Sequence, residues 1–335
     1  MRPLALFALI LVGCLPTLDD RFNVTDEPGL YGVACAPSGE VGISNASVAA
    51  YFGDEQTAEV EVLSDGDGEF HLSVTRDGDY RVTVEKGNYR STKTVPFEVD
   101  KRLPAGDICL DASDVRIAVV TGLYDSIGRL VRRLGFEVES YDGESVTSPA
   151  QMPLLYDLGE MLQYDVIFYN CGMAELWYDD DSVVASNLRS FVGAGGSVYA
   201  SDWASAIAEV IDRDAIEFVG EAEDEFNGAR RGSVGVIDAR VLDASLNTIF
   251  GGRTAEINYE LPGWVLVQDA RADSQVLLRG DHTDEFGQTW ADIPLAVRYR
   301  SEIEGGGQVI YTSFHNEEQV TADMNDILYE FILSL

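Results

Sequence analysis

The sequence is poor in basic residues. Of its 335 residues, 23 are Lys or Arg and 58 are Asp or Glu, so the formal net charge is -35. A surface of this charge repels nucleic acids and anionic membrane surfaces at long range, and we therefore expect no nucleic-acid partner. The acidic residues are spread along the whole chain, a pattern typical of a solvating surface or a salty habitat rather than of a dedicated cation site.

A phosphate-binding glycine loop is also lacking. The one dense glycine cluster, Gly193–Gly196, follows a predicted helix and precedes a predicted strand. An anion site at a helix N-terminus requires the reverse order. We expect no cofactor.

The apolar run at the N-terminus, Pro3–Val12, is too short to span a bilayer as a helix. It follows Arg2 and ends at Gly13-Cys14, an order typical of a secretory signal. Residues 11–14, LVGC, resemble the lipobox of bacterial lipoproteins. That resemblance implies a signal peptide over residues 1–14 and a lipid on Cys14. Since Leu15 is not the aspartate associated with inner-membrane retention, it also implies export and anchoring at the cell envelope, at the outer membrane facing the periplasm or the surface. An ordinary cleaved signal with a chance cysteine is the alternative.

Cysteine is scarce, with four in the chain. Cys35 and Cys109 lie in the first and last predicted strands of the N-terminal domain, and exported proteins meet an oxidising compartment. This makes them candidates for a disulfide. Cys171 follows an apolar run and is expected to be a buried free thiol, with a nucleophilic role as the alternative.

Residues 15–28 are polar and acidic with two prolines, as expected of a tether. In residues 29–112, apolar residues then recur at every second position between Asp-Gly turns. Period two over several short runs predicts a small antiparallel β-sandwich. The runs SDGDGEFHLSV and DGDYRVTVEKGNYRS resemble the carboxypeptidase-regulatory-like (transthyretin-like) repeat. The matching residues are Gly68, Phe70, Gly78, Tyr80, Val82, Gly87 and Tyr89. Such domains are spacers or binding sandwiches, so the resemblance implies no activity.

The periodicity changes after Asp111. Val115–Thr121 is a continuous β-branched run, typical of a parallel strand covered on both faces. Strands and helical patterns then alternate, which predicts a doubly wound, flavodoxin-like parallel-sheet α/β domain over residues 113–335. The predicted helices are Tyr124–Leu134, Leu154–Leu162, Asp181–Val192 and Ile327–Leu335, and the next strands are Phe136–Tyr141, Asp165–Asn170 and Ser197–Ala200. Short apolar runs between residues 213 and 300 are predicted to be strands at the far side of the sheet.

The order of these elements resembles the class I glutamine-amidotransferase-like fold, which includes the trehalose-utilisation-protein-like domains. The resemblance is carried by FVGAGGSVYASDWA and VIYTSFHNE. In working members, the first delivers a nucleophilic cysteine on a tight elbow, and the second supplies Phe-His-Pro-Glu, with a histidine base oriented by the glutamate. Here Phe314, His315 and Glu317 are retained. Asn316 replaces the proline, and the nucleophile position falls on Asp202, directly after Ser201.

An aspartate cannot form the thioester of a glutaminase, so we expect no glutaminase activity. The first interpretation is a non-catalytic binding or scaffolding domain in which His315 lies between Glu317 and Asp202. A hydrolase of an envelope or carbohydrate-derived substrate is the alternative, with Asp202 or Ser201 working with His315 and Glu317. A metal site built from Asp202, His315 and the Asp179–Asp181 loop is the third.

Several aromatic residues are predicted near the same sheet edge, where they could pack or could stack on a sugar; packing is the favoured interpretation. They are Tyr169, Trp177, Tyr178, Trp203 and Tyr311. His282 is expected in a loop. The expected partners are a membrane, through the lipid on Cys14, and an envelope glycan or protein.

Overall fold

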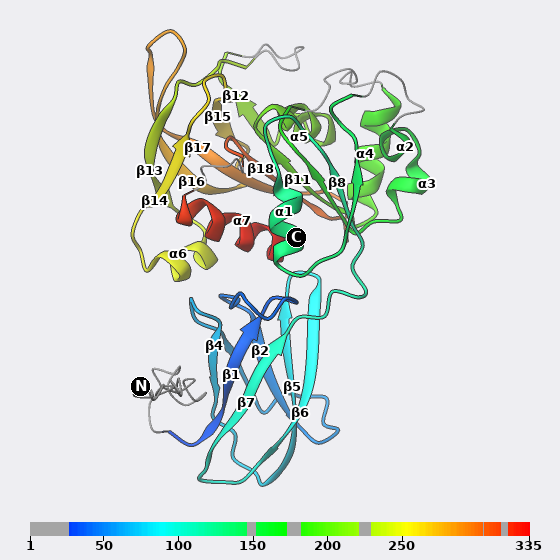
Figure 1. Cartoon of the computed structure of the whole chain (residues 1–335), viewed down its shortest axis with the longest axis vertical. Helices are drawn as coiled ribbons and strands as arrows, with labels where there is room; N and C mark the ends of the chain where they lie inside the picture. The colour runs from blue at the N-terminus through cyan, green and yellow to red at the C-terminus, as the bar shows by residue number, and fades with distance from the viewer. Residues whose placement is uncertain (1–26, 146–151, 173–181, 221–228, 304, 316–320) are drawn as a thin grey trace, which may run out of the picture.

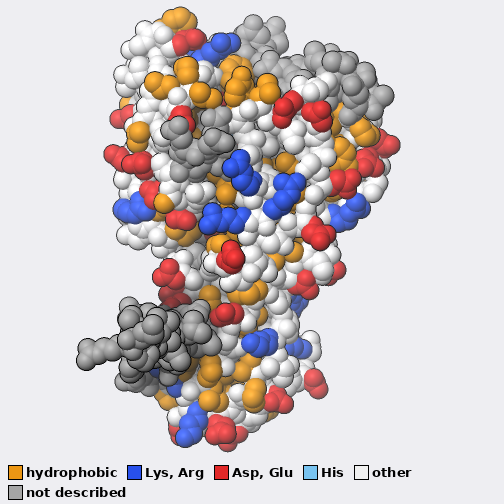
Figure 2. Space-filling model, in the orientation of Figure 1, with side chains coloured by type: hydrophobic (Ala, Val, Ile, Leu, Met, Phe, Trp, Pro, Cys, Tyr) orange, Lys and Arg blue, Asp and Glu red, His pale blue; other side chains and the backbone are white. Residues whose placement is uncertain are grey.

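The computed structural model describes residues 27–145, 152–172, 182–220, 229–303, 305–315 and 321–335. The predicted signal peptide with Cys14, and nearly all of the predicted tether, lie outside these residues. Figure 1 shows an elongated molecule in which a β-sandwich lies below a larger α/β head. Acidic side chains are scattered over the visible face of both parts (Figure 2). Within the described residues, no helix is both long and apolar enough to cross a membrane.

The sandwich consists of a three-stranded and a four-stranded sheet. The first has the order β4-β1-β7, with β4 Glu69–Leu72, β1 Gly29–Cys35 and β7 Arg102–Cys109. The second has the order β3-β2-β5-β6, with β3 Val60–Leu63, β2 Ser47–Phe52, β5 Gly78–Lys86 and β6 Tyr89–Phe97. The prediction of a wholly antiparallel sandwich is wrong at one pair, because β1 and β7 are parallel. Both strands run toward the head, where the chain leaves the sandwich.

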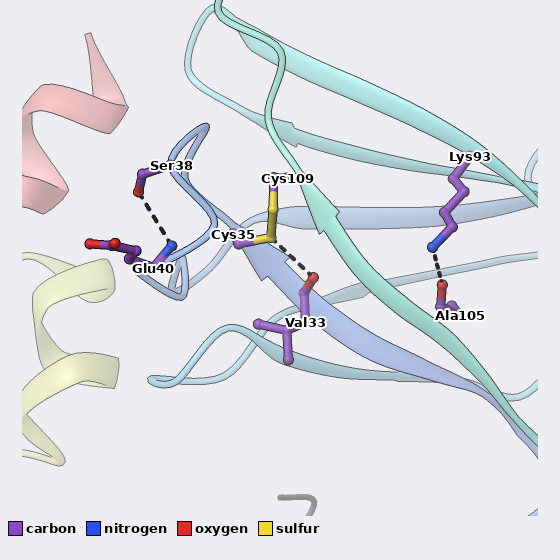
Figure 3. The surroundings of a disulfide bond; sticks show 7 residues. All are labelled: Val33, Cys35, Ser38, Glu40, Lys93, Ala105 and Cys109. Carbon is purple, nitrogen blue, oxygen red and sulfur yellow. Dashed lines mark hydrogen bonds between the residues drawn. A yellow bond between two sulfur atoms is a disulfide. The ribbon is translucent and has the colours of Figure 1, made fainter. Parts of the chain in front are cut away.

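A disulfide joins β1 to β7 at the end of the sandwich that faces the head (Figure 3). Cys35 and Cys109 are direct partners in the register of the two strands. Just beyond Cys35, the backbone N–H of Ser38 donates to the carbonyl of Leu134 in the head, at 2.9 Å. The cross-link therefore lies beside the junction of the two parts.

The head is built on a nine-stranded sheet, and one half of it is parallel. This half has the order β9-β8-β10-β11-β18. Its strands are β9 Val138–Tyr141, β8 Ile117–Val120, β10 Val166–Tyr169, β11 Ser197–Ser201 and β18 Gln308–Thr312. Numbered along the chain, this is the order 2-1-3-4-5 of flavodoxin-like folds.

The other half of the sheet is antiparallel, so the prediction of a parallel sheet is wrong for residues 235–300. Its order is β14-β13-β16-β17, continuing onto β18, and its strands are β14 Ala255–Tyr259, β13 Gly235–Val241, β16 Gln275–Thr283 and β17 Thr289–Arg300. The strands β16 and β17 form a hairpin, which needs no crossover helix. His282 is buried within β16 and not in a loop, because the hairpin continues through it. A small separate sheet pairs β12 Ile216–Phe218 with β15 Val267–Ala270.

Helices cover both faces of the parallel half. Along β10, Val166 and Phe168 contribute to the core shared with α1 Ile127–Arg133 and α7 Ala322–Ser334, whereas Ile167 and Tyr169 belong to the core on the opposite face. On that opposite face lie α2 Pro153–Tyr156, α3 Leu158–Met161, α4 Val183–Gly193 and α5 Ser205–Ile211. The helix predicted over Leu154–Leu162 is thus two short helices, separated at Asp157, whose side chain caps α3. A further helix, α6, spans Ala244–Phe250.

The sandwich and the head share one continuous hydrophobic core that includes residues of β5, α1 and α7. At its edge the Lys86 ammonium lies 2.6 Å from Glu330 Oε1 and donates to the Ser44 carbonyl at 2.9 Å. Next to it, Gly87 adopts φ +56, and a Cβ there would lie 2.6 Å from the Leu333 carbonyl oxygen. The two parts are therefore packed tightly together.

Candidate functional site

A cavity of about 510 Å³ opens at the carboxyl ends of the parallel strands. Tyr124 follows β8, Cys171 follows β10, Asp202 follows β11 and His315 follows β18. The rest of the lining is Gly172, Trp203, Arg231, Leu261, Pro262, Gly263 and Trp264. This is the edge at which open α/β sheets bind ligands and carry active sites.

Asp202 occupies a sharp turn between β11 and α5, in the short 3-10 helix Asp202–Ala204. Its φ is +46, a left-handed conformation that Asp tolerates better than most side chains. Its backbone carbonyl accepts a hydrogen bond from the Tyr311 hydroxyl at 3.0 Å. The elbow geometry is thus present, with a carboxylate at its tip.

Both carboxylate oxygens of Asp202 are in contact with other groups. Oδ1 accepts from the backbone N–H of Val265 at 2.7 Å. Oδ2 lies 3.4 Å from Cys171 Sγ and 3.4 Å from His315 Nδ1. Asp202 is 3% exposed, and its carboxylate links three segments at the floor of the cavity.

Cys171 is a buried free cysteine, as its sequence position predicts. Although it ends a different strand from the elbow, the parallel register of β10 and β11 places it beside Asp202. Burial, and secondly the charge of Asp202, raise the pKa of the Cys171 thiol far above its ordinary value. The thiol therefore keeps its proton in this environment.

Ser201 is fully buried and is not part of the cavity lining. Its hydroxyl donates to Asp125 Oδ2 at 2.5 Å and accepts from the backbone N–H of Cys171 at 3.1 Å. Its role in the structure is to hold the end of β10. The two other predicted members of the site, Glu317 and the Asp179–Asp181 loop, lie outside the described residues.

The predicted aromatic group divides in two. Tyr169 and Tyr311 are fully buried and pack in the core, whereas Trp203 lines the cavity. The Trp203 indole N–H donates to the Gly263 carbonyl at 2.8 Å, and the Arg231 guanidinium lies 5.2 Å from its ring centroid. Trp177 and Tyr178 are outside the described residues.

The opposite wall of the cavity was not predicted from the sequence. Arg231, Leu261, Pro262, Gly263 and Trp264 come from loops between the antiparallel strands. The Trp264 ring packs against the rings of Tyr259 and His282, and its centroid lies 4.0 Å from each of theirs. The Tyr259 and His282 centroids are 4.9 Å apart. No motif in the sequence marks these loops, and the only signal is the short apolar run Trp264–Val267.

No family model matches this sequence, and no curated protein matches it significantly. Among solved structures, the mmIFT52 N-terminal domain is similar, with 9% identity, a TM-score of 0.44, and coverage of 64% of this chain and 95% of that one. A ThuA-like protein from Bacteroides uniformis is similar with 12% identity, a TM-score of 0.40, and coverage of 64% and 89%. The glutaminase domain of Trypanosoma brucei CTPS, solved with bound acivicin, has 16% identity, a TM-score of 0.39, and coverage of 66% and 93%.

Proposed function

We propose that this chain is a lipoprotein of the cell envelope, anchored through Cys14, whose head binds a small ligand in the cavity and performs no acyl transfer at the elbow. The observation that carries the proposal is the carboxylate at the tip of the elbow. Asp202 stands where a nucleophile would be needed, and its Oδ1 holds the backbone of Val265. A covalent mechanism needs a nucleophile that is free to attack and a base beside it.

The cavity wall suggests the class of ligand. Trp203 is half-buried, Tyr124 is 47% exposed, and both line the cavity. Aromatic side chains in the wall of a cavity suit the apolar faces of sugar rings. Arg231 is exposed and is the only Lys or Arg among the described residues of the lining, and a guanidinium binds carboxylates through paired hydrogen bonds. We therefore propose an envelope glycan that carries an acidic sugar.

Calorimetric titration of the full-length chain with acidic and neutral oligosaccharides tests this proposal. Arg231→Gln should weaken binding of the acidic glycan about tenfold to 100-fold, as expected for loss of a hydrogen bond to a charged group. Trp203→Ala should weaken the binding of both the acidic and the neutral glycan. The matched control is Arg240→Gln, which removes an exposed arginine on β13 that pairs with Asp292 on β17. If acidic glycans bind wild type and Arg231→Gln equally, or not at all, the proposed ligand class is wrong.

The anchoring half of the proposal has its own test. In a bacterial host, Cys14→Ser should move the chain from the membrane fraction to the soluble fraction and abolish labelling with a radioactive fatty acid. Equal membrane association of both forms would contradict a lipid on Cys14.

A hydrolase is the second candidate, because His315 Nδ1 lies 3.4 Å from Asp202 Oδ2 at the edge of the cavity. In that case Asp202 would orient the imidazole, and His315 would activate a water molecule. Glycoside and ester substrates tested with wild type and His315→Ala separate the two functions. Turnover that His315→Ala abolishes would favour the hydrolase and overturn the non-catalytic proposal.

A further inference from the structure

We propose that Cys171, Asp202 and His315 together bind one divalent transition-metal ion, of the class of Zn²⁺, at the floor of the cavity. This inference goes beyond the proposed binding function, because it does not depend on which organic ligand the cavity takes. It also differs from the metal site considered from the sequence, since the third ligand is a thiol and not a carboxylate of the Asp179–Asp181 loop.

The distances fit such an ion. In a tetrahedral site with ordinary Zn–S and Zn–N or Zn–O bonds, neighbouring ligand atoms are about 3.3 to 3.6 Å apart. Asp202 Oδ2 lies 3.4 Å from Cys171 Sγ and 3.4 Å from His315 Nδ1. All three ligand atoms lie within 4.8 Å of one another. The structure thus needs only a small closing movement between the thiol and the imidazole.

The chemistry of the three ligands favours a transition metal. Thiolate and imidazole nitrogen are ligands of Zn²⁺ and related ions, whereas Mg²⁺ and Ca²⁺ prefer sites made of oxygen alone. A thiolate and a carboxylate together carry two negative charges, which a divalent ion balances inside a buried site. On binding, the Cys171 thiol would release its proton to solvent and form the metal–sulfur bond.

The ligands are held in place from outside. Val265 N–H donates to Asp202 Oδ1, which leaves Oδ2 directed at the other two ligand atoms. The Ser201 hydroxyl fixes the backbone of Cys171 and is itself held by Asp125. Such partners orient metal ligands and contribute to affinity.

The site is also accessible from the cavity. All three residues contribute to the lining of the cavity of about 510 Å³. Three protein ligands leave a fourth tetrahedral position open, as in zinc sites that bind water or a substrate oxygen. Within the described part of the chain, no other group of three His, Cys, Asp or Glu side chains gathers its ligand atoms this closely.

Cobalt titration of the full-length chain tests the proposal. Every variant carries Cys14→Ser, so that Cys171 is the only cysteine outside the Cys35–Cys109 disulfide. Co²⁺ should bind at about one ion per chain and give a sulfur-to-cobalt charge-transfer band with intense tetrahedral ligand-field bands. Zn²⁺ should displace Co²⁺ and remove these bands, and a large excess of Mg²⁺ or Ca²⁺ should leave them unchanged.

Variants of the three ligands complete the test. Cys171→Ser should abolish the charge-transfer band. Asp202→Asn and His315→Gln should weaken Co²⁺ binding by at least about 100-fold, since even outer partners of metal ligands contribute about 10- to 100-fold. The matched control is His71→Gln, which removes a half-buried imidazole of the sandwich. Circular dichroism of each variant should match that of the wild type.

Three results would overturn the proposal: no charge-transfer band in the Cys14→Ser parent, the same Co²⁺ affinity in that parent and in Cys171→Ser, or displacement of Co²⁺ by Mg²⁺ as readily as by Zn²⁺. The last would indicate loose binding to the acidic surface. Glycan binding that persists in Cys171→Ser would show that loss of the metal site leaves the proposed binding function intact, so the two proposals can fail separately.

Discussion

His282 is a polar residue that is buried in the core of the head. Its ring lies 4.0 Å from the Trp264 ring and 4.9 Å from the Tyr259 ring, and the side chain is 4% exposed. Burial lowers the pKa of His282 to about 3. The folded protein therefore holds a neutral imidazole behind the wall of the cavity, across the range of pH in which a free histidine becomes charged.

This burial predicts a loss of stability in mild acid. In the unfolded chain His282 takes up a proton near pH 6.5, but in the folded chain it does so only near pH 3. The free energy of unfolding therefore decreases as the pH falls between these two values. From pH 7 to pH 5 the loss should be about 2 kcal/mol. Urea unfolding of wild type and His282→Gln at both pH values measures it. Both proteins have the same carboxylates, so the difference between their pH dependences of stability comes from His282. If the stability of both proteins depends on pH in the same way, the buried neutral imidazole is contradicted.

Single residues also set the limit of what the sequence predicts about the site. Asp202 and His315 were found because the polar ends of two apolar strands resemble a family motif. The position of Cys171 beside them depends on which strands are neighbours, a fact that no local pattern contains. Arg231 and Trp264 lie in loops without a motif, and the antiparallel half of the sheet places these loops beside the cavity.

Among the secondary-structure elements, the parallel half of the sheet was predictable and the other half was not. Continuous apolar strands between amphipathic helices, as in Val115–Thr121, specify a covered parallel sheet. Between residues 213 and 300 the apolar runs are short. Whether such strands pair in parallel or antiparallel depends on their partners across the sheet. The same cause explains the parallel pairing of β1 with β7.

The elbow after β11 predicts an unusual order of stability among variants at Asp202. Asp202→Ala should destabilise the fold by about 1 to 3 kcal/mol, because the Val265 N–H loses its acceptor. Alanine keeps the Cβ that strains the left-handed backbone at this position. Asp202→Gly loses the same acceptor but tolerates the backbone, so it should be more stable than Asp202→Ala by about 1 kcal/mol. Urea unfolding of both variants checks this order, and equal stabilities would contradict strain at the elbow.

At the scale of the whole molecule, the sandwich and the head should unfold together. Their cores are continuous, and the buried pair Lys86–Glu330 joins them with side chains 7% and 3% exposed. Burial, opposed by Lys86, raises the pKa of Glu330. The boundary between the predicted domains at residues 112 and 113 therefore separates two sheets but not two independent cores.

The interface pair predicts a rescue. Lys86→Met leaves the Glu330 carboxyl buried without its partner and should cost about 3 to 5 kcal/mol. Adding Glu330→Leu should recover most of that loss, because a buried ion pair is often replaced by apolar side chains at little cost. Thermal unfolding, followed by circular dichroism and by tryptophan fluorescence, measures both variants. A double variant no more stable than Lys86→Met would contradict the prediction.

The parallel pairing of β1 and β7 has a consequence for access. Gly29 opens β1 at the end of the sandwich farthest from the head, and both strands point at the amino edge of the parallel sheet (Figure 1). The cavity opens at the carboxyl edge beyond it. The end of the sandwich where β1 begins and the opening of the cavity therefore lie on opposite sides of the molecule, so a surface in contact with that end of the sandwich would leave the opening uncovered.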